Sequence, residues 1–547
     1  MKLNYKRTIF VGFAFFLISA FWQAYDNAIP LILTNKFGLS QTASGVIMAL
    51  DNILALFLLP IFGTISDRCT NRRGRRTPFI VTGTVLAAVL LVTLSFVDMA
   101  QLKNISAVSE IDSPVALQTV YDDCADDSLQ TSDGDSFVLG DLFTREEFAS
   151  VYSQLEKKDG TVYLAGSEER YTLSFSEDHA ATVAKQDDGK VFTNPQYTDY
   201  VIPARQAYVY RQTMQSPVTL IFFIAVLLLV LISMAIFRSP AVALMPDVTI
   251  KPLRSKANAV INLMGTAGGM LVLGLGIVFA TGALQNAMMS YRLYFGVVAG
   301  IMLLALAIFL WQVKEPRFVR EMEAETKRLG IEEKEEEEDK GSKKSLSRAR
   351  RRSLIFLLAS IVLWFFGYNA ITSKYSVYAG NILNKDYNLT LMLAQGAAII
   401  SYLPVGFVAS RVGRKKTILA GIVMLTTAFA VAGFLRQSSP TWLMNCMFAL
   451  AGIGWATINV NSFPMVVEMC KGSDVGKYTG IYYTASMAAQ TLTPMVSGFL
   501  MDRLGMTVLF PYAAVFAGLA FVTMLFVFHG DNKPTAKKGL EALDVED

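Results

Sequence analysis

Long apolar segments alternate with short polar ones along most of the chain. A bilayer core about 30 Å thick is crossed by a helix of about 20 apolar residues. The pattern therefore predicts an all-α membrane protein with twelve transmembrane helices. The expected helices cover roughly residues 8–33, 44–65, 79–100, 217–237, 257–281, 292–313, 353–379, 390–410, 416–436, 441–469, 476–500 and 507–529.

Two polar stretches interrupt the series and set the expected domain boundaries. Within the first stretch, residues 161–164 and 171–174 alternate like short strands, and Asp188-Gly189 is a turn signal. A small β-rich domain and a disordered acidic loop both fit this stretch. The second stretch has an acidic run and then a basic run, as a solvated linker would. The expected parts are 1–100, the insertion 101–216, 217–313, the linker 314–352, 353–530 and the tail 531–547.

Short motifs recur at nearly constant offsets, which indicates an internal repeat. Asn27-Ala28-Ile29 recurs as Asn369-Ala370-Ile371, and Gly63 recurs as Gly406. Gly74-Arg75-Arg76 recurs as Gly413-Arg414-Lys415. Two pseudo-symmetric six-helix halves in parallel orientation follow, an organisation typical of transporters whose site lies between the halves.

Composition and charge agree with a membrane protein and set its orientation. Of the 547 residues 53% are hydrophobic and 17% charged, whereas soluble domains carry about 25% charge. Basic residues gather in the 2–3, 4–5 and 8–9 loops, and the 4–5 loop is expected to include Arg238. Cytoplasmic loops are enriched in Lys and Arg, so both termini are expected in the cytoplasm. Residues 101–216 hold 20 acidic and 9 basic residues and are expected outside.

The 2–3 loop carries the strongest motif, from Gly63 through Asp67-Arg68 to Gly74-Arg75-Arg76 and Pro78. A glycine lets two helices approach closely. A carboxylate at a helix end can accept from the N–H groups of a neighbouring helix start or pair with arginine. A positive-inside anchor would explain the arginines but not Asp67. We expect a conformational lock formed by Gly63, Asp67, Arg68, Gly74, Arg75 and Arg76.

This loop resembles the signature loop of the major facilitator superfamily. The long spacing closed by Pro78 is similar to that of the sucrose/proton symporters and the glycoside–pentoside–hexuronide:cation symporters. The resemblance covers the chain apart from 101–216 and the central linker, and it implies uptake of a sugar or glycoside with a proton or cation. The second copy departs from the pattern, because Ser410 stands where the first copy has Asp67. The Asp67 lock should therefore dominate.

Few ionisable residues lie inside the apolar segments, and such residues are functional candidates by default. Asp26 and Asp51 lie about 10 Å and about 12 Å from the outer ends of their helices, at 1.5 Å per residue. We expect both carboxylates to couple transport to H⁺ or Na⁺, although each also suits a helix cap or kink. Lys374 lies closer to the outer surface. It is expected to reach the interface, or else to pair with Asp26 as an outer gate.

Polar and aromatic residues recur on single faces of several helices, as a hydroxyl-rich solute would require. Core packing or an interfacial belt is the alternative for any one aromatic residue. Gln490 is the strongest candidate, because an uncovered glutamine in lipid is costly. The expected substrate-lining residues are Trp22, Tyr368, Asn369, Asn459, Asn461, Tyr482, Ser486 and Gln490.

The sequence predicts a secondary transporter of the cytoplasmic membrane that works as a monomer by alternating access. A carrier or exporter of another organic solute is one alternative, and a receptor that captures a ligand with 101–216 is another. An enzyme is not expected, because neither a nucleophile–base cluster nor a metal-ligand cluster is present. ATP-driven pumping is not expected either, because the sequence has no glycine-rich phosphate-binding loop. No metal site, cofactor or nucleic-acid partner is expected, since the chain has four cysteines and two histidines without metal-ligand spacing.

Overall fold

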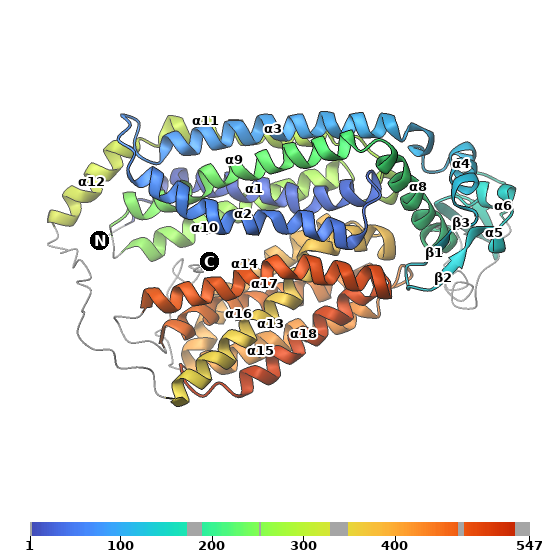
Figure 1. Cartoon of the computed structure of the whole chain (residues 1–547). Helices are drawn as coiled ribbons and strands as arrows, with labels where there is room; N and C mark the ends of the chain where they lie inside the picture. The colour runs from blue at the N-terminus through green and yellow to red at the C-terminus, as the bar shows by residue number, and fades with distance from the viewer. Residues whose placement is uncertain (1–2, 172–188, 251–252, 329–347, 469–474, 531–547) are drawn as a thin grey trace.

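The computed structural model describes residues 3–171, 189–250, 253–328, 348–468 and 475–530. The chain is mostly helical and forms two bundles of long helices with a small mixed unit at one end (Figure 1). The N-terminal half contains α1 (Tyr5–Asn35), α2 (Gln41–Asp67), α3 (Thr77–Asn104), α9 (Val218–Val248), α10 (Arg254–Val278) and α11 (Arg292–Gln312). The C-terminal half contains α13 (Arg348–Tyr378), α14 (Tyr387–Val412), α15 (Arg414–Gly433), α16 (Thr441–Glu468), α17 (Val475–Leu504) and α18 (Leu509–Leu525).

Each of the twelve apolar segments coincides with one of these helices. Among the described residues, ten helices are long and apolar enough to cross a membrane. The two long helices outside that set are α14 and α17, of 26 and 30 residues. The short turns η1 (Ser106–Val108), η4 (Leu284–Asn286), η5 (Ala379–Leu383) and η7 (Met506–Val508) lie at or between helix ends.

The two halves share one pattern of helix packing. In the first half α9 packs against α2 and α3, and α11 packs against α1 and α3. In the second half α16 packs against α14 and α15, and α18 packs against α13 and α15. When the six helices of each half are numbered 1 to 6 in chain order, both halves show the same contacts: 2 with 4, 3 with 4, 1 with 6 and 3 with 6. The repeated motifs therefore mark two copies of one helical arrangement.

The halves meet through α2 with α17, α10 with α14, and α1 with α13. Two glycines bring the backbones of α2 and α17 together. A Cβ added at Gly45 would lie 2.1 Å from the carbonyl oxygen of Pro494, and one at Gly498 would lie 2.2 Å from that of Gln41. These contacts are at the end of the bundles that carries the insertion. The bundles diverge toward the opposite end, where α1 begins and α18 ends (Figure 1).

The insertion between α3 and α9 is a folded unit in its described part. Leu117, Val120 and Phe148 are among its fully buried residues. The expectation of a β-rich domain is wrong, because helices provide more residues than strands. Of the expected strands, 161–164 is confirmed and 171–174 lies largely outside the described residues. The elements are α4 (Pro114–Cys124), β1 (Ser128–Gln130), β2 (Ser136–Val138), α5 (Leu139–Leu142), α6 (Arg145–Ala149), β3 (Gln154–Lys158), β4 (Thr161–Leu164), β5 (Lys190–Thr193), η2 (Tyr197–Val201) and α8 (Ile202–Gln215).

The expected linker 314–352 begins with an ordered helix, α12 (Glu315–Arg328). Arg7 of α1 holds this helix against the N-terminal half. Its guanidinium donates to the carbonyl oxygens of Phe318 and Val248 at 2.8 and 2.9 Å and lies 4.0 Å from the centre of the Phe318 ring. The first part of the linker is therefore docked rather than solvated. Its acidic and basic runs fall largely outside the described residues.

Close packing of α3 on α9 gives a stability test. A Cβ at Gly83 would lie 2.6 Å from Cβ of Phe237 and 2.7 Å from the carbonyl oxygen of Ser233. Overpacking of this kind costs about 1–3 kcal/mol, so we expect Gly83→Val to lower the melting temperature of the detergent-purified protein. Gly300→Val on α11 is the matched control, because a Cβ there meets no atom within 4 Å. Equal melting temperatures for the two variants would contradict this packing.

Candidate functional site

Three helices of the N-terminal half place charged residues close together. α1 carries Trp22 and Asp26 one turn apart, α2 carries Asp51, and α9 carries Arg238. Electrostatic interactions link Asp26 with both Asp51 and Arg238, and Arg238 also acts on Asp51. The guanidinium of Arg238 lies 5.6 Å from the centre of the Trp22 ring. The two predicted coupling carboxylates therefore share one cation, Arg238, which itself lies beside the Trp22 ring.

The placement of Arg238 differs from the expectation. The sequence assigned it to the 4–5 loop, because the uncharged apolar run ends at Phe237. Instead α9 continues through Pro240 and Pro246 to Val248, which leaves Arg238 inside the helix. Proline is tolerated in membrane helices because neighbouring groups satisfy the freed backbone atoms. Because the helix end was placed where the uncharged run ends, Arg238 was counted as a loop residue and not as a residue of the candidate site.

A pair of glutamines joins the two halves near these charges. Gln395 of α14 donates from Nε2 to Oε1 of Gln23 on α1 at 2.7 Å. Gly269 of α10 lies beside both, since a Cβ there would be 3.4 Å from Gln23 Oε1 and 3.6 Å from Gln395 Oε1. Neither glutamine was predicted. The sequence could have indicated both glutamines, because an uncovered side-chain amide in lipid is as costly for them as for Gln490.

In the C-terminal half, the predicted residue Tyr368 stacks on Trp455 with ring centres 3.7 Å apart and planes 5° from parallel. Trp455 was not predicted to line the site. Within the part of the chain that the structure describes, neither Nε1 of Trp22 nor Nδ2 of Asn369 has a hydrogen-bond partner. Buried donors of this kind are costly unless something accepts from them. Both halves therefore offer an aromatic ring together with a donor that a ligand oxygen would satisfy.

The other predicted lining residues belong to α16 and α17. Asn461 and Ser486 are buried, and each donates to a backbone carbonyl of its own helix, at 2.9 and 3.0 Å. The hydroxyls of Tyr482 and Ser462 lie 3.2 Å apart. These contacts lie within the C-terminal half, and a lining role for these side chains stays a prediction. The remaining two are half-buried: Asn459 on α16 and Gln490 on α17.

At the end opposite the insertion, the predicted lock residues form an ion-pair network. Arg76 pairs with Asp67 at 2.5 Å and with Asp247 at 2.8 Å, and Arg75 pairs with Asp247 at 2.6 Å. Burial acts to lower the pKa of Arg76, but hydrogen bonds and charges from the two aspartates raise it overall above its ordinary value. Arg68 is exposed. This network joins the 2–3 loop to the end of α9.

Two glycines of the lock sit at close contacts. A Cβ at Gly63 would lie 2.9 Å from Oγ of Ser239 on α9. Gly74 has a φ of +113°, and a Cβ there would meet the carboxylate of Glu315 at 2.2 Å. Glu315 accepts from the backbone N–H groups of Arg75, Arg76 and Thr77 at 2.8–2.9 Å, so it caps the start of α3. The sequence analysis did not single out Glu315, because its partners are some 240 residues away.

At the insertion end, a lysine and an aspartate of the C-terminal half contact the start of α2. Lys374 is fully buried and donates to the carbonyl oxygen of Gln41 at 2.6 Å. Asp502 accepts from the backbone N–H groups of Gln41 and Thr42 at 2.8 and 2.7 Å and from the Thr42 hydroxyl at 2.5 Å. Both expectations for Lys374 are wrong. It reaches neither the membrane interface nor Asp26, since Gln41 lies nearer and Asp502 is its charged neighbour.

Family models match most of the chain. A model of the "Major Facilitator Superfamily" matches residues 212–398 and 381–544, and one of "MFS/sugar transport protein" matches residues 10–105. The chain belongs to the major facilitator superfamily. The family predicted from the loop motif is thereby confirmed, and the protein is a multi-pass membrane transporter rather than an enzyme.

Curated relatives align over short parts of the chain. The "MFS-type transporter ppzB" of Metarhizium rileyi (strain RCEF 4871) is 26% identical over 143 residues, which are 26% of this chain and 28% of that protein. The "Sucrose transport protein SUT1" of Oryza sativa subsp. japonica is 37% identical over 76 residues, 13% of this chain and 14% of that protein. The chain thus aligns with about a quarter of the length of the first relative and about a seventh of the second.

Solved structures are similar over nearly the whole chain. The inward open conformation of the xylose transporter XylE from E. coli has a TM-score of 0.56 at 14% identity and covers 99% of both chains. A D-xylose-proton symporter has a TM-score of 0.51 at 15% identity, covering 96% of this chain and 99% of that one. At such low identity these likenesses show the fold of the superfamily.

The contact of Asp502 with α2 gives a test of closure in this transporter. We expect Asp502→Ala to open the insertion end, because the carboxylate holds the positive end of α2 across the two halves. The readout is labelling of a Gly269→Cys reporter by an impermeant maleimide added on the insertion side. Labelling should accelerate about ten-fold if the substitution removes about 1.4 kcal/mol from the free energy that favours closure of the insertion end. Arg503→Ala is the control, since Arg503 lies over Phe499 of its own helix. Unchanged labelling in Asp502→Ala would argue against the closure.

Proposed function

We propose that the chain is a symporter that moves a sugar or glycoside together with a proton or Na⁺ by alternating access. The observation that carries this proposal is the group of Asp26, Asp51 and Arg238 beside Trp22 within membrane helices. Two carboxylates beside one guanidinium leave one negative charge when both are ionised. An uncompensated charge inside a membrane protein is energetically costly. Binding of a proton or cation that neutralises this charge is therefore favourable.

The proposal includes α14 and α17 as membrane spans, which makes twelve in all. Both helices pack between other long helices of the C-terminal half and against the N-terminal half. The basic 2–3 and 8–9 loops then face the cytoplasm, in keeping with the positive-inside rule. The insertion, with its acidic excess, faces outside. The chain is proposed to work as a monomer, because both halves of the site belong to one chain.

Three features support a hydroxyl-rich solute. Aromatic rings on both halves offer flat apolar faces, namely Trp22 and the stacked pair of Tyr368 and Trp455. Trp22 and Asn369 provide the donors without a described partner noted above. The third feature is similarity to proteins named for sugar transport, over residues 10–105 and over 76 residues of a sucrose transport protein.

The places where the two halves meet support the proposed alternating access. Asp502, Lys374 and the paired glycines Gly45 and Gly498 close the insertion end. The bundles diverge at the other end (Figure 1). We take this arrangement as the inward-facing state. In the outward-facing state the contacts around Gln41 separate, and Asp67, whose carboxylate side chain is 58% exposed here, becomes free to meet the C-terminal half.

The test is solute uptake into proteoliposomes with a panel of mono- and disaccharides, with and without a pH or Na⁺ gradient. We expect gradient-driven accumulation in the wild type and its loss in Asp26→Asn and Asp51→Asn, with downhill exchange retained, because only the coupling carboxylates are neutralised. Glu323→Gln on the exposed face of α12 is the matched control and should behave as wild type. No sugar flux under any gradient would contradict the substrate class and favour another organic solute.

A further inference from the structure

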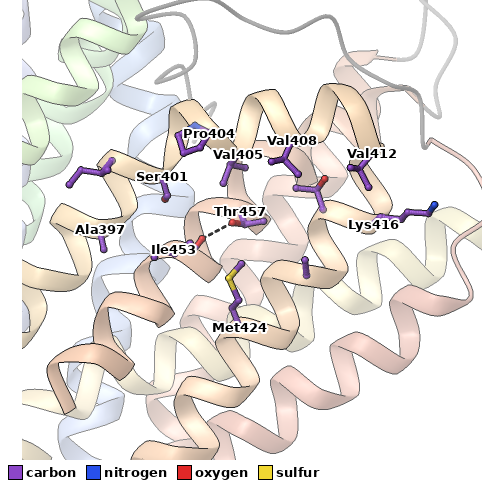
Figure 2. Close-up of a pocket in the computed structure, with 13 residues that line it drawn as sticks. Ala397, Ser401, Pro404, Val405, Val408, Val412, Lys416, Met424, Ile453 and Thr457 are labelled. Atoms are coloured by element: carbon purple, nitrogen blue, oxygen red, sulfur yellow. Dashed lines mark hydrogen bonds between the residues drawn. The ribbon is translucent and has the colours of Figure 1, made fainter. Parts of the chain in front are cut away.

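A lateral cavity of about 590 Å³ lies in the C-terminal half, away from the candidate site. Residues of α14, α15 and α16 line it (Figure 2). On α14 they recur every three or four residues from Ala397 to Val412, so they form one stripe along the helix. Both α14 and α15 pack against α16, which adds Ile453 and Thr457 to the lining. Its volume falls within the range of about 300–1,000 Å³ of small-molecule sites.

The cavity faces lipid and not the other half. The α14 residues that contact the N-terminal half include Asn388, Met392, Gln395 and Gly396, which lie on a different face of the helix. Ile400 in the cavity stripe is 77% exposed. The hydroxyl of Thr457 bonds to the carbonyl oxygen of Ile453 at 2.7 Å, the dashed line in Figure 2. The lining therefore presents hydrocarbon to a membrane whose interior is hydrocarbon.

One end of the cavity is cationic. Lys416 lies beside Val412, at the opposite end of the stripe from Ala397, and it is exposed (Figure 2). The neighbouring Lys415 is directed elsewhere, because its ammonium group donates to the carbonyl oxygen of Leu525 at 3.0 Å and lies 4.8 Å from the centre of the Phe528 ring. An apolar groove that ends at an exposed ammonium group matches an acyl chain that ends at a phosphate.

We propose that this cavity binds an anionic glycerophospholipid, with one acyl chain along the α14 stripe and the phosphate beside Lys416. A lysine near an anionic headgroup is worth a factor of about five in affinity. The acyl chain contributes through close packing against the α14 stripe rather than through hydrophobic burial, because it moves from one hydrocarbon environment into another. Assignment to the cytoplasmic leaflet rests on the orientation proposed above, whereas the binding itself does not depend on any transported solute.

The test is native mass spectrometry of the whole protein after exchange into mixed phosphatidylglycerol and phosphatidylcholine. We expect retained phosphatidylglycerol in the wild type, about five-fold less in Lys416→Ala, and no loss in the control Lys415→Ala. Ala420→Phe, which puts a ring into the cavity, should abolish retention, while Val423→Phe on the same helix outside the lining should not. Equal retention of phosphatidylglycerol in all four variants would overturn the proposal. Equal retention of phosphatidylglycerol and phosphatidylcholine would overturn the role of Lys416.

A second, independent observation concerns the insertion, whose described residues touch the C-terminal half at two points. Met506 donates its backbone N–H to the carbonyl oxygen of Ser132 at 2.8 Å. Gly134 and Gly505 meet there backbone to backbone with φ of +96° and +88°, and a Cβ on Gly505 would lie 2.6 Å from the nitrogen of Gly134. At the other point, the side-chain amide of Gln437 donates to the carbonyl oxygen of Thr193 at 2.7 Å.

The same insertion is fixed to the N-terminal half. Gln206 of α8 donates to the carbonyl oxygen of Leu39 at 2.9 Å. Gly38 lies so close to α8 that a Cβ there would be 2.3 Å from the nitrogen of Tyr210. The insertion therefore runs from one half to the other across the closed end. Opening of that end requires both contacts with the C-terminal half to break.

We infer that the insertion is a clasp that favours closure of this end, an inference that rests on the proposed alternating access. A Ser132→Cys/Met506→Cys pair tests it in proteoliposomes. We expect oxidation to stop uptake and reduction to restore it, while a Ser128→Cys/Val138→Cys pair, whose residues face each other across β1 and β2, leaves uptake unchanged. Uptake that continues through the oxidised cross-half pair would overturn the clasp.

A second readout separates failure of the clasp from failure of the proposed substrate. Gln437→Ala removes one contact without touching the candidate site. It should speed maleimide labelling of Gly269→Cys from the insertion side several-fold, whether or not a sugar is transported. Labelling at the wild-type rate would overturn the clasp even if no solute were known.

Discussion

The contact of α2 with α17 is the interaction on which the rest of the structure depends. Gly45 and Gly498 let the two backbones touch, and Asp502 then reaches the free N–H groups at the start of α2. Those groups have no partner inside their own helix, so a carboxylate from the other half satisfies them and also meets the positive end of the helix dipole. One residue thereby adds a polar link to the place where the backbones of the two bundles touch.

Because that contact sits at one end, it sets the geometry of everything between the halves. α1 and α13 are held side by side, and Gln23 is held against Gln395. The charged group of Asp26, Asp51 and Arg238 lies wholly within the N-terminal half. This division suits a transporter that couples ion binding to movement. The N-terminal half holds the charged residues, and the C-terminal half supplies contacts that form in one state and break in the other.

The apolar pattern was sufficient to locate all twelve long helices, because membrane thickness imposes a length that few other structures share. The site was only partly predictable. Asp26 and Asp51 stood out as charges in apolar runs, but Arg238 was assigned to a loop because the uncharged run ends at Phe237. Asp502 and Glu315 act through contacts with residues 460 and 240 positions away, which no local pattern reveals. The helices of the insertion were missed because their short amphipathic turns lie among strand-like alternations.

The central claim is that the two ends of the molecule open alternately. Pulsed dipolar spectroscopy in proteoliposomes tests it most directly, with spin labels at positions 71 and 411 on the diverging end and at 292 and 438 on the insertion end. The account predicts that solute and a proton or Na⁺ gradient shorten the 71–411 distance while the 292–438 distance lengthens. Distances that stay fixed, or that change together in the same direction, would contradict it.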